Sequence, residues 1–245
     1  MDNANYISLS RQSGLMKEMS TIANNMANAD TVGYKREGAI FSEFIAASGG
    51  SAEDNDLRHS LSMGRLAAHA DYFDTGGLRS TGGNLDVAIE GEGFFLVDVE
   101  GETRLTRAGH FMTNENGLMV NVDGRPVLDA AEGQIQIPPE ASSITISPDG
   151  TLSADGVEFG RLGVVTANLD SLVREGGNNW SAPEGFEAVE DSKVLQGFLE
   201  DSNVQPVTEI ARMIEVQRLY DAGQKILDME DSRIKQVIST IRQIS

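Results

Sequence analysis

Between residues 5 and 30, apolar residues recur every seven positions, the spacing that places side chains on one face of an α-helix. The members of this repeat are Leu9, Leu15, Met16, Met19, Ile22, Ala23 and Met26. They predict one helix with a single broad apolar face, and Gly33 predicts its stop. The stretch IANNMANADTVGYK (22–35) adds three asparagines, although Asn favours caps and turns over helix interiors. Something outside the helix is therefore expected to use their amides.

The other end of the chain has a stricter seven-residue repeat. Its members are Met213, Tyr220, Leu227, Ile234 and Ile241, with Val216, Val237 and Ile244 each three residues after a partner. This pattern is typical of a coiled-coil seam. A helix that starts at Pro206-Val207 would run for roughly 37 residues, or about 55 Å. We expect the two terminal helices to bury their apolar faces against each other as a stalk.

The middle of the chain has the pattern of short β-strands. The runs LMVNV, SSITIS and RLGVVTANL are rich in Val, Ile and Thr, and LDVAIEGEGFFLVDV (85–99) predicts two strands hinged at Gly91 and Gly93. Turn pairs separate the runs. These pairs are Asn116-Gly117, Asp123-Gly124, Asp149-Gly150 and Asp155-Gly156. Residues 46–64 are small, polar and charged, and they predict an exposed connector or loop.

The predicted fold is α+β and mainly β. Residues 1–33 form an N-terminal helix, 34–76 a connector, 77–200 a central all-β domain of hairpins and 201–245 a C-terminal helix. The terminal helices pair as a coiled-coil stalk.

The composition of the chain argues against several classes of function. The chain has 245 residues and a net charge of −19, which argues against binding nucleic acid or anionic lipid. It contains no cysteine, so disulfides and thiolate chemistry are excluded. No apolar run approaches the ~20 residues of a membrane-spanning helix, and the start lacks the apolar core of a secretory signal. Sequence alone indicates the cytoplasm, although a chain exported without such a signal would look the same.

Motifs for catalysis are weak. Gly91-Glu92-Gly93 lacks the third glycine of a dinucleotide fingerprint. The three histidines have no partner at metal-ligand spacing, and the acidic turns lack a calcium-loop spacing. Asp86 is expected to be hydrogen-bonded to a turn, and Trp180 to anchor a loop rather than stack on a ligand. We therefore predict no catalytic residue, no cofactor and no metal.

Four stretches in order carry a family resemblance. ANNMANADTVGYKR (23–36), LDVAIEGEGFF (85–95), TRAGHFMTNENGLMVNVDGRPVL (106–128) and SNVQPVTEIARMIEVQRLYD (202–221) resemble blocks of the flagellar rod and hook proteins. The resemblance covers nearly the whole chain. The opening MDNANY and Pro206-Val207 after SNVQ are more similar to the proximal-rod members, with the distal-rod members as the alternative.

The resemblance implies a structural subunit of the flagellar basal-body rod, without enzymatic activity. Such a subunit is exported through the flagellar type III apparatus without a cleaved signal peptide. It would assemble with itself and with other rod proteins in the periplasm, as part of the drive shaft that transmits torque from motor to hook. No nucleic acid and no membrane insertion are expected.

An assembly interface follows from the same resemblance. Its candidate residues are Leu9, Met16, Met19, Ile22, Asn24, Asn25, Asn28, Met213, Tyr220, Leu227, Ile234 and Ile241. In a tube of helices the asparagine amides would bond across subunits, because buried amides need partners. The alternative is that these asparagines face water.

Two other function classes stay open from sequence. One is a β-domain protein that binds or hydrolyses glycan, which needs two positioned carboxylates that no motif nominates. The other is a binding module that dimerises through its C-terminal helix, in which case that helix alone should dimerise.

Overall fold

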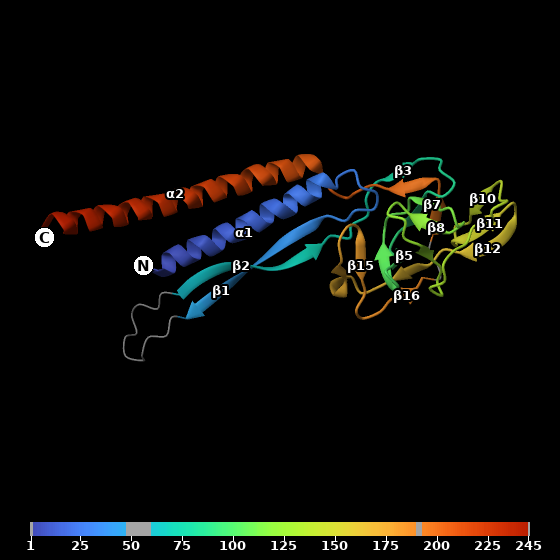
Figure 1. Cartoon of the computed structure of the whole chain (residues 1–245), viewed down its shortest axis with the longest axis horizontal. Helices are drawn as coiled ribbons and strands as arrows, with labels where there is room; N and C mark the ends of the chain where they lie inside the picture. The colour runs from blue at the N-terminus through green and yellow to red at the C-terminus, as the bar shows by residue number, and fades with distance from the viewer. Residues whose placement is uncertain (1, 48–59, 190–192, 245) are drawn as a thin grey trace. The chain divides into compact units, whose positions relative to one another are not determined.

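The computed structural model describes residues 2–47, 60–189 and 193–244 (Figure 1). The chain divides into two compact units. The first, the terminal unit, comprises Met1–Ala27, Glu37–Tyr72 and Gln205–Ser245. The second, the β unit, comprises Asn28–Arg36 and Phe73–Val204. The chain therefore passes between the units four times.

The terminal unit contains both long helices and one β-hairpin. Helix α1 is Asp2–Ala27 and helix α2 is Pro206–Ile244. Strand β1, Glu37–Ala47, pairs antiparallel with β2, Ser60–Asp71. Helix α1 contacts α2, β1 and β2, so it lies between the second helix and the hairpin (Figure 1).

The boundaries of the helices test the sequence predictions. The start of α2 at Pro206 is confirmed. Helix α1 ends at Ala27, so the predicted stop at Gly33 is wrong. Residues 28–36 fold with the β unit instead, which also moves the predicted boundary of the N-terminal segment. No helix among the described residues is both long and apolar enough to cross a membrane.

The structure corrects the prediction of an exposed connector or loop at residues 46–64. Within 46–64, residues 46–47 and 60–64 belong to paired strands, and 48–59 lie outside the described residues. The hairpin register runs from Glu37 opposite Asp71 to Ala47 opposite Ser60, with one shift after Ile40. The strands escaped prediction because β1 (EGAIFSEFIAA) does not alternate apolar and polar residues, and β2 is rich in Ala and Ser.

The β unit is built from short antiparallel strands. Its largest sheet has seven strands, in the order β14-β15-β6-β5-β13-β16 with β9 on β5, and a second sheet has the order β10-β11-β12. Pairs β17-β4, β18-β3 and β7-β8 complete it. The strands are β3 Leu78–Ser80, β4 Val87–Glu90, β5 Phe94–Val99, β6 Glu102–Thr106, β7 Phe111–Thr113, β8 Met119–Asn121, β9 Val127–Leu128, β10 Ile144–Ile146, β11 Thr151–Ala154, β12 Val157–Arg161, β13 Val164–Thr166, β14 Val173–Arg174, β15 Asn179–Ser181, β16 Glu187–Ala188, β17 Lys193–Gln196 and β18 Phe198–Glu200, with a 3₁₀ turn at Leu169–Ser171.

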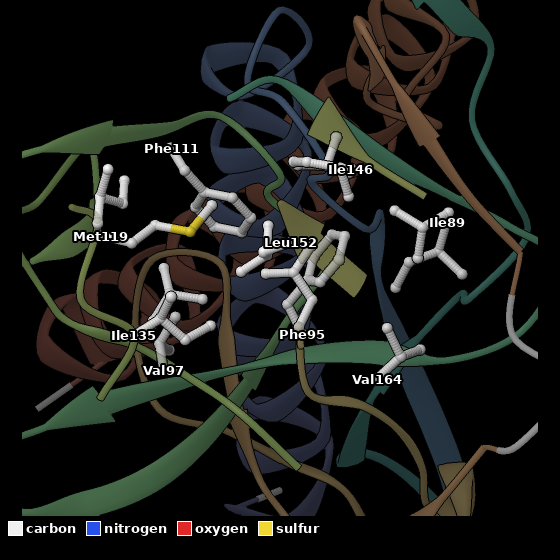
Figure 2. Packing of buried hydrophobic residues seen from close by; sticks show 14 residues of the cluster. Ile89, Phe95, Val97, Phe111, Met119, Ile135, Ile146, Leu152 and Val164 are labelled. Carbon is white, nitrogen blue, oxygen red and sulfur yellow. The ribbon is translucent and has the colours of Figure 1, made fainter. Parts of the chain in front are cut away.

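Strand β5 divides the core of the β unit into two clusters. Alternate side chains of a strand point to opposite faces. Phe95 and Val97 join the larger cluster, which Figure 2 shows with Phe111, Met119 and Leu152 around Phe95. Phe94 and Leu96 join the second cluster, with Leu105, Leu128, Val165 and Trp180. Burial on both faces explains why residues 94–97 of this strand are all apolar.

The predicted turns are confirmed. Gly91 and Gly93 have φ of +100° and +131° between β4 and β5, which is backbone that favours glycine. Asp155 and Gly156 both have positive φ between β11 and β12, as a two-residue hairpin turn requires.

Candidate functional site

The first candidate site is the seam between α1 and α2 in the terminal unit. Leu15, Ile22 and Val216 are buried together there. Met19, Met213 and Tyr220 pack against them. The prediction that the terminal helices bury apolar faces against each other is confirmed for this part of the seam. Leu227 and Ile234 are half-buried, and the side chain of Ile241 lies outside the described residues.

Pairs of polar side chains bridge the same seam and show the relative direction of the two helices. Gln12 donates to Gln224 at 3.0 Å, and Arg212 donates to Glu18 at 2.9 Å. Nearer the other end, Asn25 Nδ2 lies 3.4 Å from Glu209 Oε2. Because residue numbers rise along α1 while their partners fall along α2, the two helices are antiparallel.

Asn25 is the most constrained of the three asparagines. Its side chain is only 1% exposed. Its Nδ2 donates to the carbonyl of Glu37 at 2.8 Å, and its Oδ1 accepts from the Glu37 N–H at 2.9 Å. One amide therefore satisfies both backbone groups of the first residue of β1 and also reaches α2 through Glu209. Asn25 therefore uses both polar atoms of its amide within the chain.

The other predicted residues of α1 differ in exposure. Met19 and Ile22 lie in the seam, whereas Leu9 and Met16 are 61% and 55% exposed. The predicted apolar face of α1 is therefore only partly covered by α2. Asn24 is exposed, and Asn28 accepts a hydrogen bond from the hydroxyl of Thr31 at 3.1 Å.

Apolar side chains also remain exposed on α2. They are Val207, Ile210, Ile214, Leu219, Ile226, Met229 and Ile238. Isolated exposed apolar residues are ordinary, but a series along one helix marks a surface for further packing.

The second candidate site is the segment Gly33-Tyr34-Lys35, which sequence reasoning placed at the helix end. In the structure this segment docks into the β unit. The Gly33 N–H donates to the carbonyl of Glu200 at 2.7 Å, and the Tyr34 side chain is 2% exposed. An added Cβ on Gly33 would lie 2.4 Å from the backbone of Arg107. Sequence reasoning considered Gly33 only as a helix stop, and Tyr34 and Lys35 entered only with the family resemblance, because a three-residue segment has no periodicity to read.

Three buried charges meet beside the docked segment. Lys35 Nζ lies 2.6 Å from Glu200 Oε1, and both side chains are 1% exposed. Arg107 Nε lies 3.0 Å from Glu200 Oε2, without the alignment of a hydrogen bond. Burial lowers the pKa of the Lys35 amino group and that of the Arg107 guanidinium, while the Glu200 charge opposes both shifts.

Arg174 covers the docked segment from outside. Its guanidinium lies 5.1 Å from the ring centre of Tyr34 and 4.8 Å from that of Trp180, and it donates to the carbonyl of Lys35 at 2.6 Å. Trp180 is fully buried in strand β15, against Phe73 and Phe94. Trp180 is thus a core anchor, although it lies in a strand rather than a loop.

The polar residues considered for chemistry are engaged in structural contacts. Asp86 accepts from the Thr81 hydroxyl at 2.5 Å and lies 2.5 Å from Nδ1 of His110, consistent with the predicted hydrogen bonding near a turn. Within residues 2–47, 60–189 and 193–244, no group of three His, Asp or Glu side chains is arranged to hold a metal.

Comparison with known proteins matches three parts of the chain to families. Residues 6–35 match the flagella basal body rod protein, 88–154 the D1 domain of the flagellar hook protein FlgE/F/G, and 195–240 the C-terminal part of the flagellar basal body rod FlgEFG protein. The flagellar basal-body rod protein FlgF of Caulobacter vibrioides is 39% identical, over 93% of both chains. The chain belongs to the flagellar basal-body rod and hook family.

Other members of the rod and hook family are similar over nearly the whole chain. FlgF of Mesorhizobium japonicum is 32% identical over 98% of both chains. FlgG of Bacillus subtilis is also 32% identical, over 97% of this chain and 98% of its own. Lys35, Arg107 and Glu200 each come from a different one of the three matched parts, so the buried charges join all three.

Proposed function

We propose that this chain is a structural subunit of the flagellar basal-body rod that assembles with copies of itself and with other rod and hook proteins. The observation that carries the proposal is the distribution of apolar side chains on the two helices of the terminal unit. Its helices bury one apolar face against each other and leave further apolar residues exposed on both helices. Within a family of rod proteins, those faces are surfaces for neighbouring subunits.

Several finer features belong to the same proposal. The paired helices form a coiled-coil stalk, in which the heptad positions of α2 continue past Tyr220 through Leu227, Ile234 and Ile241. Leu9, Met16 and Asn24 contact neighbouring subunits. Met19, Ile22, Met213 and Tyr220, which pack in the α1–α2 seam, support that surface from within.

The position of the subunit is part of the proposal. The FlgF relatives, at 39% and 32% identity over nearly the whole chain, favour the proximal rod. The distal rod remains the alternative, because FlgG of Bacillus subtilis is 32% identical over 97% of this chain. The subunit would reach the periplasm through the flagellar export apparatus without a cleaved signal peptide. Its activity there is mechanical, namely transmission of torque through subunit contacts.

The test is electron microscopy of basal bodies from a strain that lacks this gene. We expect loss of rod and hook, and loss of swimming. The intact gene should restore them, whereas a copy truncated before Pro206 should not, because it lacks α2. Complete basal bodies and normal swimming in the deletion strain would overturn the proposal.

A further inference from the structure

The chain connects the two units at four points, and three of them lead into one cluster within the β unit. The connections follow Ala27, Arg36, Tyr72 and Val204. Arg36 is the last residue before the second connection, and Asn203 lies one residue before the end of the β unit. Asp74 is the second residue of the β unit after the third connection. These residues are far apart in sequence but are bonded to one another.

Asn203 ties three of these chain segments together. Its Oδ1 accepts from the Arg36 N–H at 2.6 Å, and its Nδ2 donates to the carbonyl of Asp74 at 3.0 Å. Its own N–H donates to the carbonyl of Tyr34 at 3.3 Å. A single residue thus bonds to the segment that ends at Arg36 and to the segment that begins at Phe73.

The ion pair between Lys35 and Glu200 links the same chain segments as Asn203. Lys35 Nζ donates to the carbonyl of Asp74 at 2.8 Å and to Glu200 Oε1 at 2.6 Å. Glu200 Oε1 also accepts from the Gly76 N–H at 3.0 Å. Residues 28–36 lie between the first and second connections. Docking of this segment against Glu200 therefore restrains both of those connections.

Arg107 connects this cluster to the seven-stranded sheet. Its two terminal nitrogens donate to the carbonyls of Gly93 and Gly91, each at 2.6 Å. Those glycines form the turn between β4 and β5, and β5 runs through the centre of the seven-stranded sheet. Through the ion pair between Arg107 and Glu200, the crossing segments are linked to the turn that leads into β5.

Buried charges are a poor choice if stability is the only requirement. Removing charges from water costs free energy that their attraction only partly returns, and well-packed apolar residues often do as well. Charged and amide groups differ from apolar ones in being directional, because each bond sets both a distance and an angle. A cluster of this kind suits a place where chain segments must keep a defined geometry under load.

We propose that Lys35, Asp74, Arg107, Glu200 and Asn203 form a mechanical clamp that holds the chain crossings of the β unit together. Load passing between the units then acts on several cross-tied segments rather than on separate flexible peptides. The inference rests on the proposed rod function for its source of load. The clamp itself is a property of the single chain.

The clamp is tested first by amide hydrogen exchange on the full-length purified protein. In Lys35→Met and in Asn203→Ala we expect exchange at the Gly33 amide to accelerate about tenfold or more, while the Leu96 amide in strand β5 keeps its rate. Gly33 is a suitable reporter because its acceptor, the Glu200 carbonyl, is untouched in both variants. The control is Arg79→Ala, which breaks an exposed ion pair with Asp201 in the same unit and should leave Gly33 unchanged.

Unchanged Gly33 exchange in both variants would overturn the clamp. If Lys35→Met loses protection throughout the β unit, Asn203→Ala decides, since it removes two side-chain hydrogen bonds and no buried charge.

The mechanical consequence is tested in cells that carry Asn203→Ala. We expect rods in normal number and a loss of swimming speed that grows with the viscosity of the medium, in contrast to Arg79→Ala. Equal speeds of both strains at every viscosity would overturn the mechanical role. Failure of the rod function itself would appear separately, as intact basal bodies in the deletion strain, and would leave the exchange result standing.

Discussion

Asn25 and Lys35 show how single residues in the N-terminal signature serve different units. The Asn25 amide bonds to the first residue of β1 within the terminal unit. Lys35, ten positions later, is buried with Glu200 within the β unit. A polar group withdrawn from water must find partners. Each of these residues finds them inside its own chain.

Gly33 is expected to be intolerant of any side chain. Its φ of +66° strains an L-residue, and a Cβ would lie 2.4 Å from the Arg107 backbone. We predict that Gly33→Ala lowers the free energy of unfolding of the β unit by about 3 kcal/mol or more. The single, buried Trp180 provides the fluorescence signal for urea unfolding.

The matched control for that substitution is Gly124→Ala. Gly124 has a similar φ of +77° but nothing within 4 Å of an added Cβ. It should lose only about 1 kcal/mol, from backbone strain alone. Equal losses in the two variants would show that residue 33 does not approach the Arg107 backbone closely.

Lys35 should give the β unit a measurable pH dependence. Burial lowers the pKa of its amino group below the ordinary value of 10.5, so between the two values the unfolded chain binds more protons than the folded one. Stability contributed by this group therefore rises as pH increases through the lowered pKa towards 10.5. Urea unfolding at a series of alkaline pH values should show this upward slope, and Lys35→Met should lack it. A slope of the same size in both proteins would contradict the assignment.

At the scale of elements, α1 is shaped by having two partners. Leu15, Met19 and Ile22 face α2, and the helix also contacts β1 and β2. On α2, the seven-residue repeat that contains Val216 reaches Gly223, which lies beside Gln12. Gln12 in turn bonds to Gln224. A small residue in the second helix thus leaves room for a polar side chain of the first.

Gly223 offers a test of this packing. An added Cβ would lie 3.6 Å from Gln12 Nε2 and 3.7 Å from its Cγ, which is ordinary van der Waals contact. Because glycine costs a helix interior about 0.5–1 kcal/mol relative to alanine, Gly223→Ala should stabilise the helices by that amount. Thermal melting followed at 222 nm measures the change.

A larger side chain at the same place should have the opposite effect. Gly223→Leu would crowd Gln12 and lower the melting temperature. A lower melting temperature for Gly223→Ala itself would mean that the helices approach more closely here than the structure shows.

At the scale of the whole molecule, charge and apolar surface act in opposite directions. The net charge of −19 keeps separate copies apart in solution. The exposed apolar residues of α1 and α2 favour association once copies are brought together. Under the proposed rod function, copies must stay apart before assembly and then pack stably, and this balance suits both requirements.

The balance predicts a variant that folds but does not assemble. Ile226 is 57% exposed, so Ile226→Glu should leave the helices of the monomer intact by circular dichroism yet prevent incorporation into rods. Lys225→Glu, at an exposed neighbouring position, alters charge without touching the apolar series and should incorporate normally. Formation of normal rods by the Ile226→Glu variant would show that Ile226 does not lie in the subunit interface.

The sequence by itself determined the features that depend on near neighbours. Heptad spacing located the C-terminal helix, and its start at Pro206 is where the pattern put it. Asp-Gly and Asn-Gly pairs located turns, because positive φ restricts the residue type wherever the rest of the chain lies. Strands β4 and β5 followed from their apolar runs and the glycines between them.

Only the tertiary structure decided which partner each residue meets. Asn24 and Asn25 are identical neighbours, yet one is exposed and the other buried, because about 100° of helix rotation separates them. The β1–β2 hairpin and the docking of residues 33–35 depend on contacts with distant segments, which leave little periodic signal in their own sequence. Lys35 became interpretable only when folding brought Glu200 and Arg107 beside it, since a buried charge is explained by its partners and not by its neighbours in the chain.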